Sequence, residues 1–131
     1  MMRLTPIVMM LLTACVIHTG PGPADYPPAH TAAGLSASLA LATSHVDGEL
    51  LEVRDSALVI LTRDRVVLVP FSAIDSGTFA DSRIAIGHGQ KPLADDFESI
   101  RLLSRYPQGI PPEALRRILA GKGQDDLVLL R

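Results

Sequence analysis

The run Gly87-His88-Gly89-Gln90-Lys91 contains the residues of this sequence that are best suited to ligand binding. Glycines allow backbone amides to approach an anion closely, and a lysine adds positive charge. His88 and Lys91 are therefore candidate residues for binding a small anionic or glycan ligand. The spacing of a phosphate-binding loop is absent, so an ordinary loop with a solvated histidine is the competing interpretation.

The other polar residues form no catalytic or metal-binding pattern. Asp95-Asp96 and Asp125-Asp126 are adjacent in sequence, so their side chains diverge and suit a solvated surface. His45 and Asp47 could approach Asp55 at a turn, but no spacing typical of a metal site occurs. A Gly-x-Ser-x-Gly nucleophile motif is also absent. We therefore expect no enzymatic activity, no metal and no cofactor.

The only cysteine of the chain ends the run Leu12-Thr13-Ala14-Cys15. Before it come one positive residue, Arg3, and the apolar residues 4–12, which is the layout of a secretory signal. This run is too short to be a membrane span, which needs roughly 20 apolar residues. The four residues resemble the lipobox of bacterial lipoproteins, and the resemblance covers residues 1–15. It implies that residues 1–14 are a signal peptide and that Cys15 carries a diacylglycerol thioether and usually an N-acyl chain.

This resemblance also implies where the protein is located. Two or more acyl chains anchor a protein stably, so the expected membrane contact is the lipid on Cys15. In lipoproteins of bacteria with two membranes, Asp after the cysteine favours the inner membrane. Val16 therefore implies the outer membrane, facing the periplasm. The alternative is an ordinary cleaved signal that leaves Cys15 as a free thiol.

The composition argues against several classes of binding partner. Removing residues 1–14 leaves 117 of 131 residues, and losing Arg3 changes the net charge from −2 to −3. This balance provides no basic surface for nucleic acid or for anionic lipid. Tryptophan is absent and aromatic residues make up 4%, which argues against a stacking surface for bases or sugars. The 47% hydrophobic content permits one small domain without disulfides.

Residues 15–36 are rich in proline and glycine and show no regular apolar period, which predicts a disordered tether. A single domain is expected over residues 37–131, with residues 31–41 open to either a strand or a loose helical turn. Its β core is predicted over residues 39–90. Short apolar or alternating runs predict strands at 48–54, 57–61, 66–69, 76–79 and 83–86. Leu51 and Val53 are expected on one side of the first of these strands.

Residues 48–74 resemble the strand and 3₁₀ rhythm of SH3-like and Sm-like small barrels, and no functional residue is carried over from that resemblance. Apolar spacing predicts helices at about 92–105, with Leu93, Phe97, Ile100 and Leu103 on one face, and at 111–120. Residues 126–130 predict a terminal strand. Tyr106, in the proline-containing loop between the helices, is a candidate contact for a partner protein; the alternative is a connector whose ring packs on the barrel.

The predicted fold is therefore α+β: a small antiparallel barrel, or a strongly curved sheet of about five strands, with two C-terminal helices and a short terminal strand. The predicted function is a non-catalytic structural or adaptor role in the bacterial cell envelope, with another envelope protein as partner. A binding module for a small anion or glycan at residues 87–91 is the alternative.

Overall fold

In a computed structural model of the protein, which describes residues 35–131, seven strands form one sheet and two α-helices pack against it. The fold is α+β, as predicted. The strand order is β6-β5-β1-β2-β3-β4-β7, and all neighbours are antiparallel except β4 and β7. The elements in chain order are β1 (Leu35–Leu41), β2 (His45–Val53), β3 (Ala57–Leu61), β4 (Val66–Pro70), the 3₁₀ helix η1 (Phe71–Ala73), β5 (Ile74–Phe79), β6 (Ala85–Gly87), α1 (Ala94–Leu103), α2 (Pro112–Gly121) and β7 (Val128–Leu129).

The number of strands differs from the prediction because of one strand at the start of the described chain. Strands β2 to β6 correspond to the five predicted runs, and β7 lies within the predicted terminal strand. The additional strand is β1, which begins at Leu35, so the tether predicted to reach Ser36 extends two residues too far. Its alternating burial, with Leu39 and Leu41 buried and Ser36 exposed, is typical of a strand.

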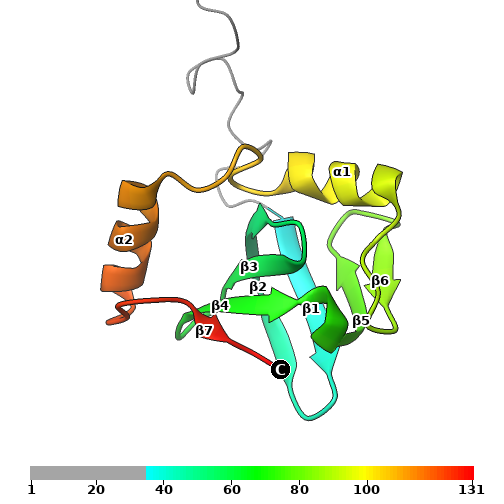
Figure 1. The fold of residues 1–131 in the computed structure, drawn as a ribbon, viewed down its shortest axis with the longest axis horizontal. Coiled ribbons are helices and arrows are strands. Elements are labelled where there is room, and N and C mark those ends of the chain that lie inside the picture. The colour runs from blue at the N-terminus through cyan, green and yellow to red at the C-terminus, as the bar shows by residue number, and fades with distance from the viewer. Residues whose placement is uncertain (1–34) are drawn as a thin grey trace, which may run out of the picture.

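The sheet is strongly curved but open. Register shifts occur in β1 between Ala40 and Leu41 and in β2 between Leu50 and Glu52, and such bulges bend a strand and increase its twist. Strands β3 and β4 consequently cross in front of β1 and β2 at a steep angle (Figure 1). Strands β6 and β7 form the two edges and do not pair with each other, so the sheet is not a closed barrel.

The concave face of the sheet holds the larger apolar core, which we call the first cluster. Its strands contribute alternate residues, as the two-residue period of a strand requires. Helix α1 closes one end of this core with Ile100, which has no exposed surface, and with Phe97, whose ring centroid lies 6.2 Å from that of Phe71. The buried residues of the first cluster are Ala37, Leu39, Leu41, Val46, Leu50, Val53, Leu58, Ile60, Val67, Val69, Phe71, Ile74, Phe79, Ile86 and Ile100.

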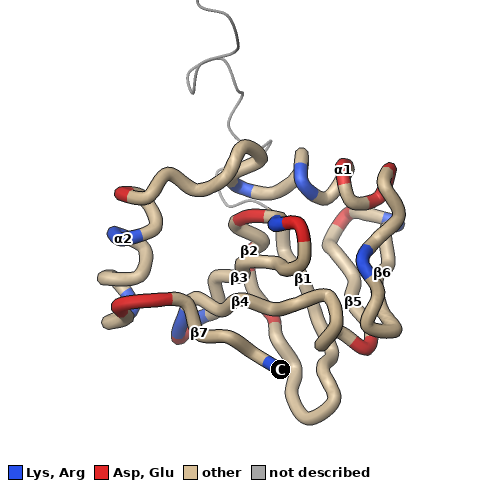
Figure 2. The backbone as a smooth tube through the Cα atoms, in the orientation of Figure 1, with Lys and Arg blue, Asp and Glu red and all other residues tan. Residues whose placement is uncertain are grey.

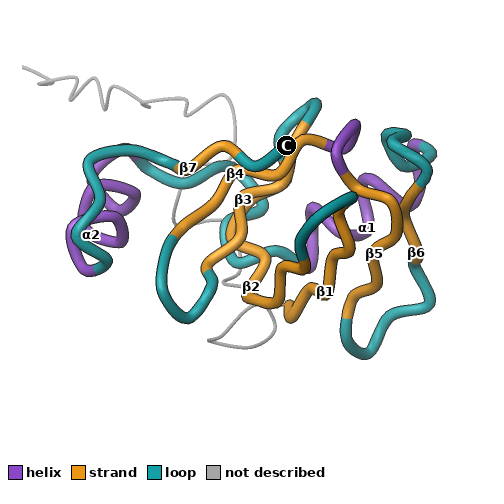
Figure 3. The backbone as a smooth tube through the Cα atoms, turned by 90° about the horizontal axis from the view of Figure 1, so that it is seen from below, coloured by secondary structure: helices purple, strands orange, loops and turns teal. Residues whose placement is uncertain are grey.

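A smaller apolar core, the second cluster, lies on the opposite, outer face of β2, β3 and β4. Helix α2 and residues 104–111, which we call the connector, cover it. Helix α2 stands at the β7 end of the sheet, far from β6, in both Figure 1 and Figure 3. The buried members are Leu51, Val59, Val66 and Leu119, with Leu61, Leu68, Tyr106, Ile110, Leu115, Ile118 and Leu127 packed against them.

Two predictions of which side chains share a face of a strand or helix are wrong. Leu51 and Val53 were expected on the same side of one strand, but the bulge in β2 places Leu51 in the second cluster and Val53 in the first. Leu93 was expected on the buried face of the first helix, but α1 begins only at Ala94 and 81% of Leu93 is exposed. Both errors arise where a regular period is interrupted.

Candidate functional site

The predicted ligand loop connects β6 to the segment before α1. Its backbone N–H groups already donate hydrogen bonds to carbonyls of the protein. His88 and Gly89 adopt positive φ angles of 58° and 65°. The His88 N–H donates to the Asp75 carbonyl at 2.9 Å, and the Gly89 N–H donates to the Ile74 carbonyl at 2.9 Å. The Gln90 N–H bonds the Gly87 carbonyl at 3.2 Å. Because these amides close the turn, they are not directed at a ligand as in an anion-binding loop.

His88 and Lys91 do border the same part of the surface. Both line an open hollow of about 470 Å³ beside β6, together with Asp75 and Asp96. The Lys91 ammonium also lies 4.4 Å from the centroid of the Phe97 ring, within the range of a cation–π contact. The two carboxylates oppose the binding of an anion, so the hollow is better suited to an uncharged polar ligand.

Tyr106 is only partly available at the surface. Its ring packs against the second cluster, and its N–H donates to the Leu51 carbonyl at 2.8 Å. The neighbouring Arg105 N–H donates to the Leu50 carbonyl at 3.0 Å. The bulge in β2 lies at these residues, so the connector supplies two hydrogen bonds where the sheet pairing is irregular. Tyr106 is thus part of the connector's attachment to the sheet.

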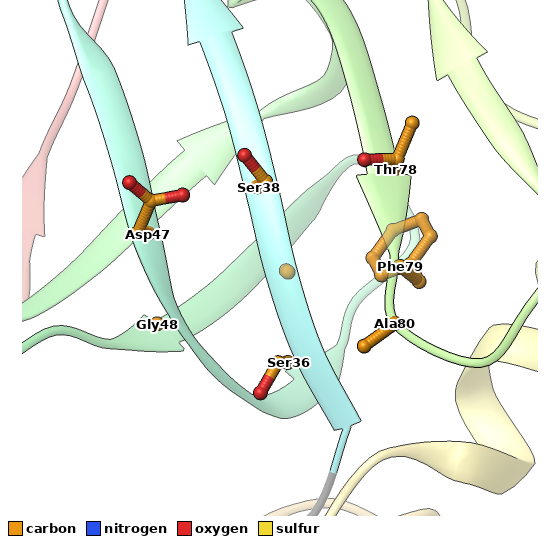
Figure 4. Close-up of a pocket in the computed structure, with 8 residues that line it drawn as sticks. Ser36, Ser38, Asp47, Gly48, Thr78, Phe79 and Ala80 are labelled. Carbon is orange, nitrogen blue, oxygen red and sulfur yellow. The ribbon is translucent and has the colours of Figure 1, made fainter.

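The outer face of the sheet also has a region that the sequence analysis did not identify, which we call the bare half. It lies on β1, β5, β6 and the start of β2, where no described helix covers the sheet. Around Ser36, Ser38, Thr78 and Ala80 the surface forms an open hollow of about 350 Å³, bordered by Asp47 (Figure 4). The alternation of small residues with leucines in residues 35–41 was the available signal for this face.

One group of residues on the bare half has the composition of a catalytic triad. Ser38 Oγ lies 3.0 Å from His45 Nε2, and Asp47 Oδ1 lies 3.1 Å from the same nitrogen. A catalytic relay needs the serine and the aspartate on opposite ring nitrogens. Here both oxygens share Nε2, so the histidine cannot take a proton from Ser38 while Asp47 holds the other nitrogen. His45 and Asp47 do not gather with Asp55, the third residue considered from the sequence.

Two ion pairs lie where the connector meets β2. Arg105 Nε is 3.4 Å from Glu49 Oε1, and Arg54 Nε is 3.3 Å from Glu52 Oε2. The side chain of Glu49 is 18% exposed. Burial raises the pKa of Glu49 above its ordinary value of 4.5, and the positive charge of Arg105 offsets part of that effect. The ionised form of Glu49 is therefore disfavoured in the folded domain.

A third ion pair secures the end of α1. Glu98 accepts hydrogen bonds from two nitrogens of Arg101, which lower the pKa of this exposed carboxyl. Arg101 also donates to the Pro107 carbonyl, and the buried Ser104 hydroxyl donates to the Arg101 carbonyl at 2.6 Å. These bonds connect the C-terminal turn of α1 to the connector.

Charge and metal-binding groups are dispersed over the described chain. Figure 2 shows Lys and Arg interleaved with Asp and Glu on both helices and on the strand connections. No group of three His, Cys, Asp or Glu side chains within residues 35–131 could hold a metal ion. None of the helices in this range is long and apolar enough to cross a membrane. Cys15, the predicted lipidation site, lies outside the described residues.

Comparison with known proteins supplies no family for this chain. No protein-family model, curated protein or solved structure matches it.

Proposed function

We propose that the protein is a lipid-anchored lipoprotein of the bacterial outer membrane that holds a non-catalytic adaptor domain in the periplasm. The observation that carries this proposal is the run Leu12-Thr13-Ala14-Cys15, in which the only cysteine occupies the position that lipidation requires. The signal-like residues before it and the proline-rich residues after it agree with an anchor followed by a spacer.

Within this proposal, the partner is another envelope protein that binds the β6 end of the sheet. Strand β6 is an edge, and unpaired strand edges are templates for a further strand. The adjoining bare half presents small side chains that allow close approach. The connector is the alternative contact surface, although the ring of Tyr106 packs on the second cluster.

The anchor is tested by expressing the full chain in a bacterial host with two membranes. We expect intact mass to show cleavage before Cys15 and added lipid, and detergent partitioning to place the protein in the detergent phase. Cys15→Ala should remain uncut and unlipidated, and Val16→Asp should move the lipidated protein to the inner membrane. An unlipidated, aqueous wild type would refute the anchor.

The contact surface is tested by photo-crosslinking in the same cells. A crosslinker at Ala85 of β6 should give a defined protein adduct that disappears in the Cys15→Ala background. The matched control places the crosslinker at Arg117, which is exposed on α2 at the far end of the sheet. Equal adducts from both positions, or none from Ala85, would contradict a contact at β6.

A second candidate function is supported by the hollow that His88 and Lys91 share with Asp75 and Asp96. In this alternative the domain binds a small polar ligand, for which a neutral oligosaccharide is a better match than an anion. Amide chemical shifts of residues 87–91 should then move on addition of a neutral oligosaccharide and stay unchanged with inorganic phosphate. No movement with either probe would remove this candidate.

We also infer that β1 to β5 constitute an incompletely closed SH3-like barrel. Their order, β5-β1-β2-β3-β4, and the 3₁₀ helix η1 between β4 and β5 support this assignment. On this view β6 and β7 are additions at the two edges. A crystal structure in which η1 bridges β4 and β5 would support it, and one with a flat sheet would contradict it.

A further inference from the structure

The contact between the connector and β2 contains a carboxylate in an unfavourable environment. Glu49 Oε1 has almost no accessible surface and accepts no hydrogen bond from any residue within 35–131. Arg105 Nε approaches it to 3.4 Å, which is an ion-pair distance, but without hydrogen-bond geometry. A buried carboxylate oxygen without a donor disfavours the ionised form, because the charge loses its hydration.

The position of Glu49 connects this environment to the attachment of the connector. Glu49 precedes Leu50 and Leu51, whose carbonyls accept the N–H groups of Arg105 and Tyr106. Arg105 also lies beside the Glu49 carboxylate, so breaking these two bonds would free the connector to move away and would let water reach Glu49. The attached state therefore holds Glu49 in a drier environment than the open state does.

The other charged and titratable groups around Glu49 are few within the described chain. The connector contributes Arg105 and the Tyr106 phenol, and β2 contributes Asp47 and the Glu52–Arg54 pair. Opposite Glu49, β1 presents Ser36, which does not titrate. Arg105 favours the ionised carboxylate, burial disfavours it, and burial has the larger effect on the pKa of Glu49.

We propose that Glu49 is a proton-linked latch: proton uptake by its carboxylate favours the connector attached to β2, and ionisation favours local opening. Opening removes the Tyr106 ring from the second cluster and exposes Leu51, which has no accessible surface in the attached state. The latch would thus control the availability of an apolar surface at the connector. It does not depend on the lipid anchor or on a partner at β6.

The direction of the pH effect follows from the pKa of Glu49, which burial raises above 4.5. The attached state binds more protons than the open state between 4.5 and the raised pKa. Its stability is therefore fully present below 4.5 and decreases as the pH rises through the raised value. An exposed carboxylate in a favourable ion pair has the opposite dependence.

The experiment is amide hydrogen exchange of the full chain in detergent micelles, followed by NMR between pH 4.5 and 8. After correction for intrinsic exchange rates, protection of the Arg105 and Tyr106 amides should decrease roughly three- to tenfold as the pH rises. Core amides such as that of Leu58 should not follow this change. In Glu49→Gln, protection should be higher at neutral pH and independent of pH.

Glu52→Gln is the matched control, because Glu52 lies on the same strand with a similarly buried side chain, 16% exposed, and pairs with Arg54. This variant should keep the pH dependence of the wild type. Protection that is independent of pH in the wild type would overturn the latch, a conclusion that needs no variant to fold. Equal pH dependence in wild type and Glu49→Gln would overturn it as well.

Discussion

The outer face of the sheet has two halves, which differ in the size of their side chains and in whether other elements cover them. On β2, β3 and β4 the outward side chains are large and apolar, and α2 and the connector cover them. We call this the covered half. On the bare half the exposed residues are mostly small, among them Ser36 of β1, Thr78 of β5 and Ala85 of β6. Apolar clusters therefore pack on both faces of the sheet at β2, β3 and β4, but only on the concave face at β1, β5 and β6.

The difference shows that side-chain size along a strand decides which part of a sheet needs a second layer. Val59 and Leu51 have no accessible surface because α2 and the connector supply apolar partners. Burial of such side chains is favourable in proportion to the apolar area removed from water. Ser and Thr bury little apolar area, so a helix over the bare half would gain little stability. The bare half is free to face solvent or a partner.

The largest effect should come from removing an apolar side chain from the covered half. Leu51→Ala leaves a cavity in the second cluster and should lower the free energy of unfolding by about 2–5 kcal/mol. Thr78→Ala on the bare half should change it by less than about 0.5 kcal/mol. Urea denaturation followed by circular dichroism measures both. Similar losses for the two variants would show that the halves do not differ energetically.

An intermediate effect is expected at Gly48 in β2, the strand that borders both halves. A Cβ atom there would lie 2.3 Å from the Leu61 carbonyl oxygen and 2.8 Å from Ile60 Cγ2. Gly48→Ala must therefore push β2 and β3 apart, and we expect a loss of about 1–3 kcal/mol. Gly121→Ala is the control, since no atom beyond its chain neighbours and the nearby backbone of its own helix lies within 4 Å of its added Cβ. A neutral result for Gly48→Ala in thermal unfolding would mean that the strands separate at little cost.

The smallest of the three losses in the free energy of unfolding is expected at the edges of the two halves. The Gln124 side chain accepts from the Val66 N–H at 2.7 Å and donates to the Val66 carbonyl at 2.9 Å, completing the edge of β4 beside β7. Gln124→Ala should cost about 1–2 kcal/mol and increase aggregation on heating. Gln90→Ala, in the exposed loop after β6, should change neither. Light scattering during thermal unfolding tests this prediction, and unchanged aggregation in Gln124→Ala would contradict edge protection.

The sequence by itself predicted much of the framework. Local periods placed β2 to β6 and both helices, because alternation and 3.6-residue spacing reflect burial directly. The all-apolar run at 57–61 was predicted to be a strand, and β3 contacts both clusters. The lipobox at Cys15 is likewise a property of the sequence alone, and it remains a prediction.

Only the tertiary structure decided where these periods are interrupted and which side chains on different elements contact each other. The bulge in β2 moves Leu51 to the outer face, because one extra residue inverts the direction of the side chains that follow. The approach of Arg105 to Glu49 joins residues 56 positions apart, and the contact of Ser38 with His45 depends on the pairing of β1 with β2. Such contacts depend on register and on chain packing, which no local pattern of residues encodes.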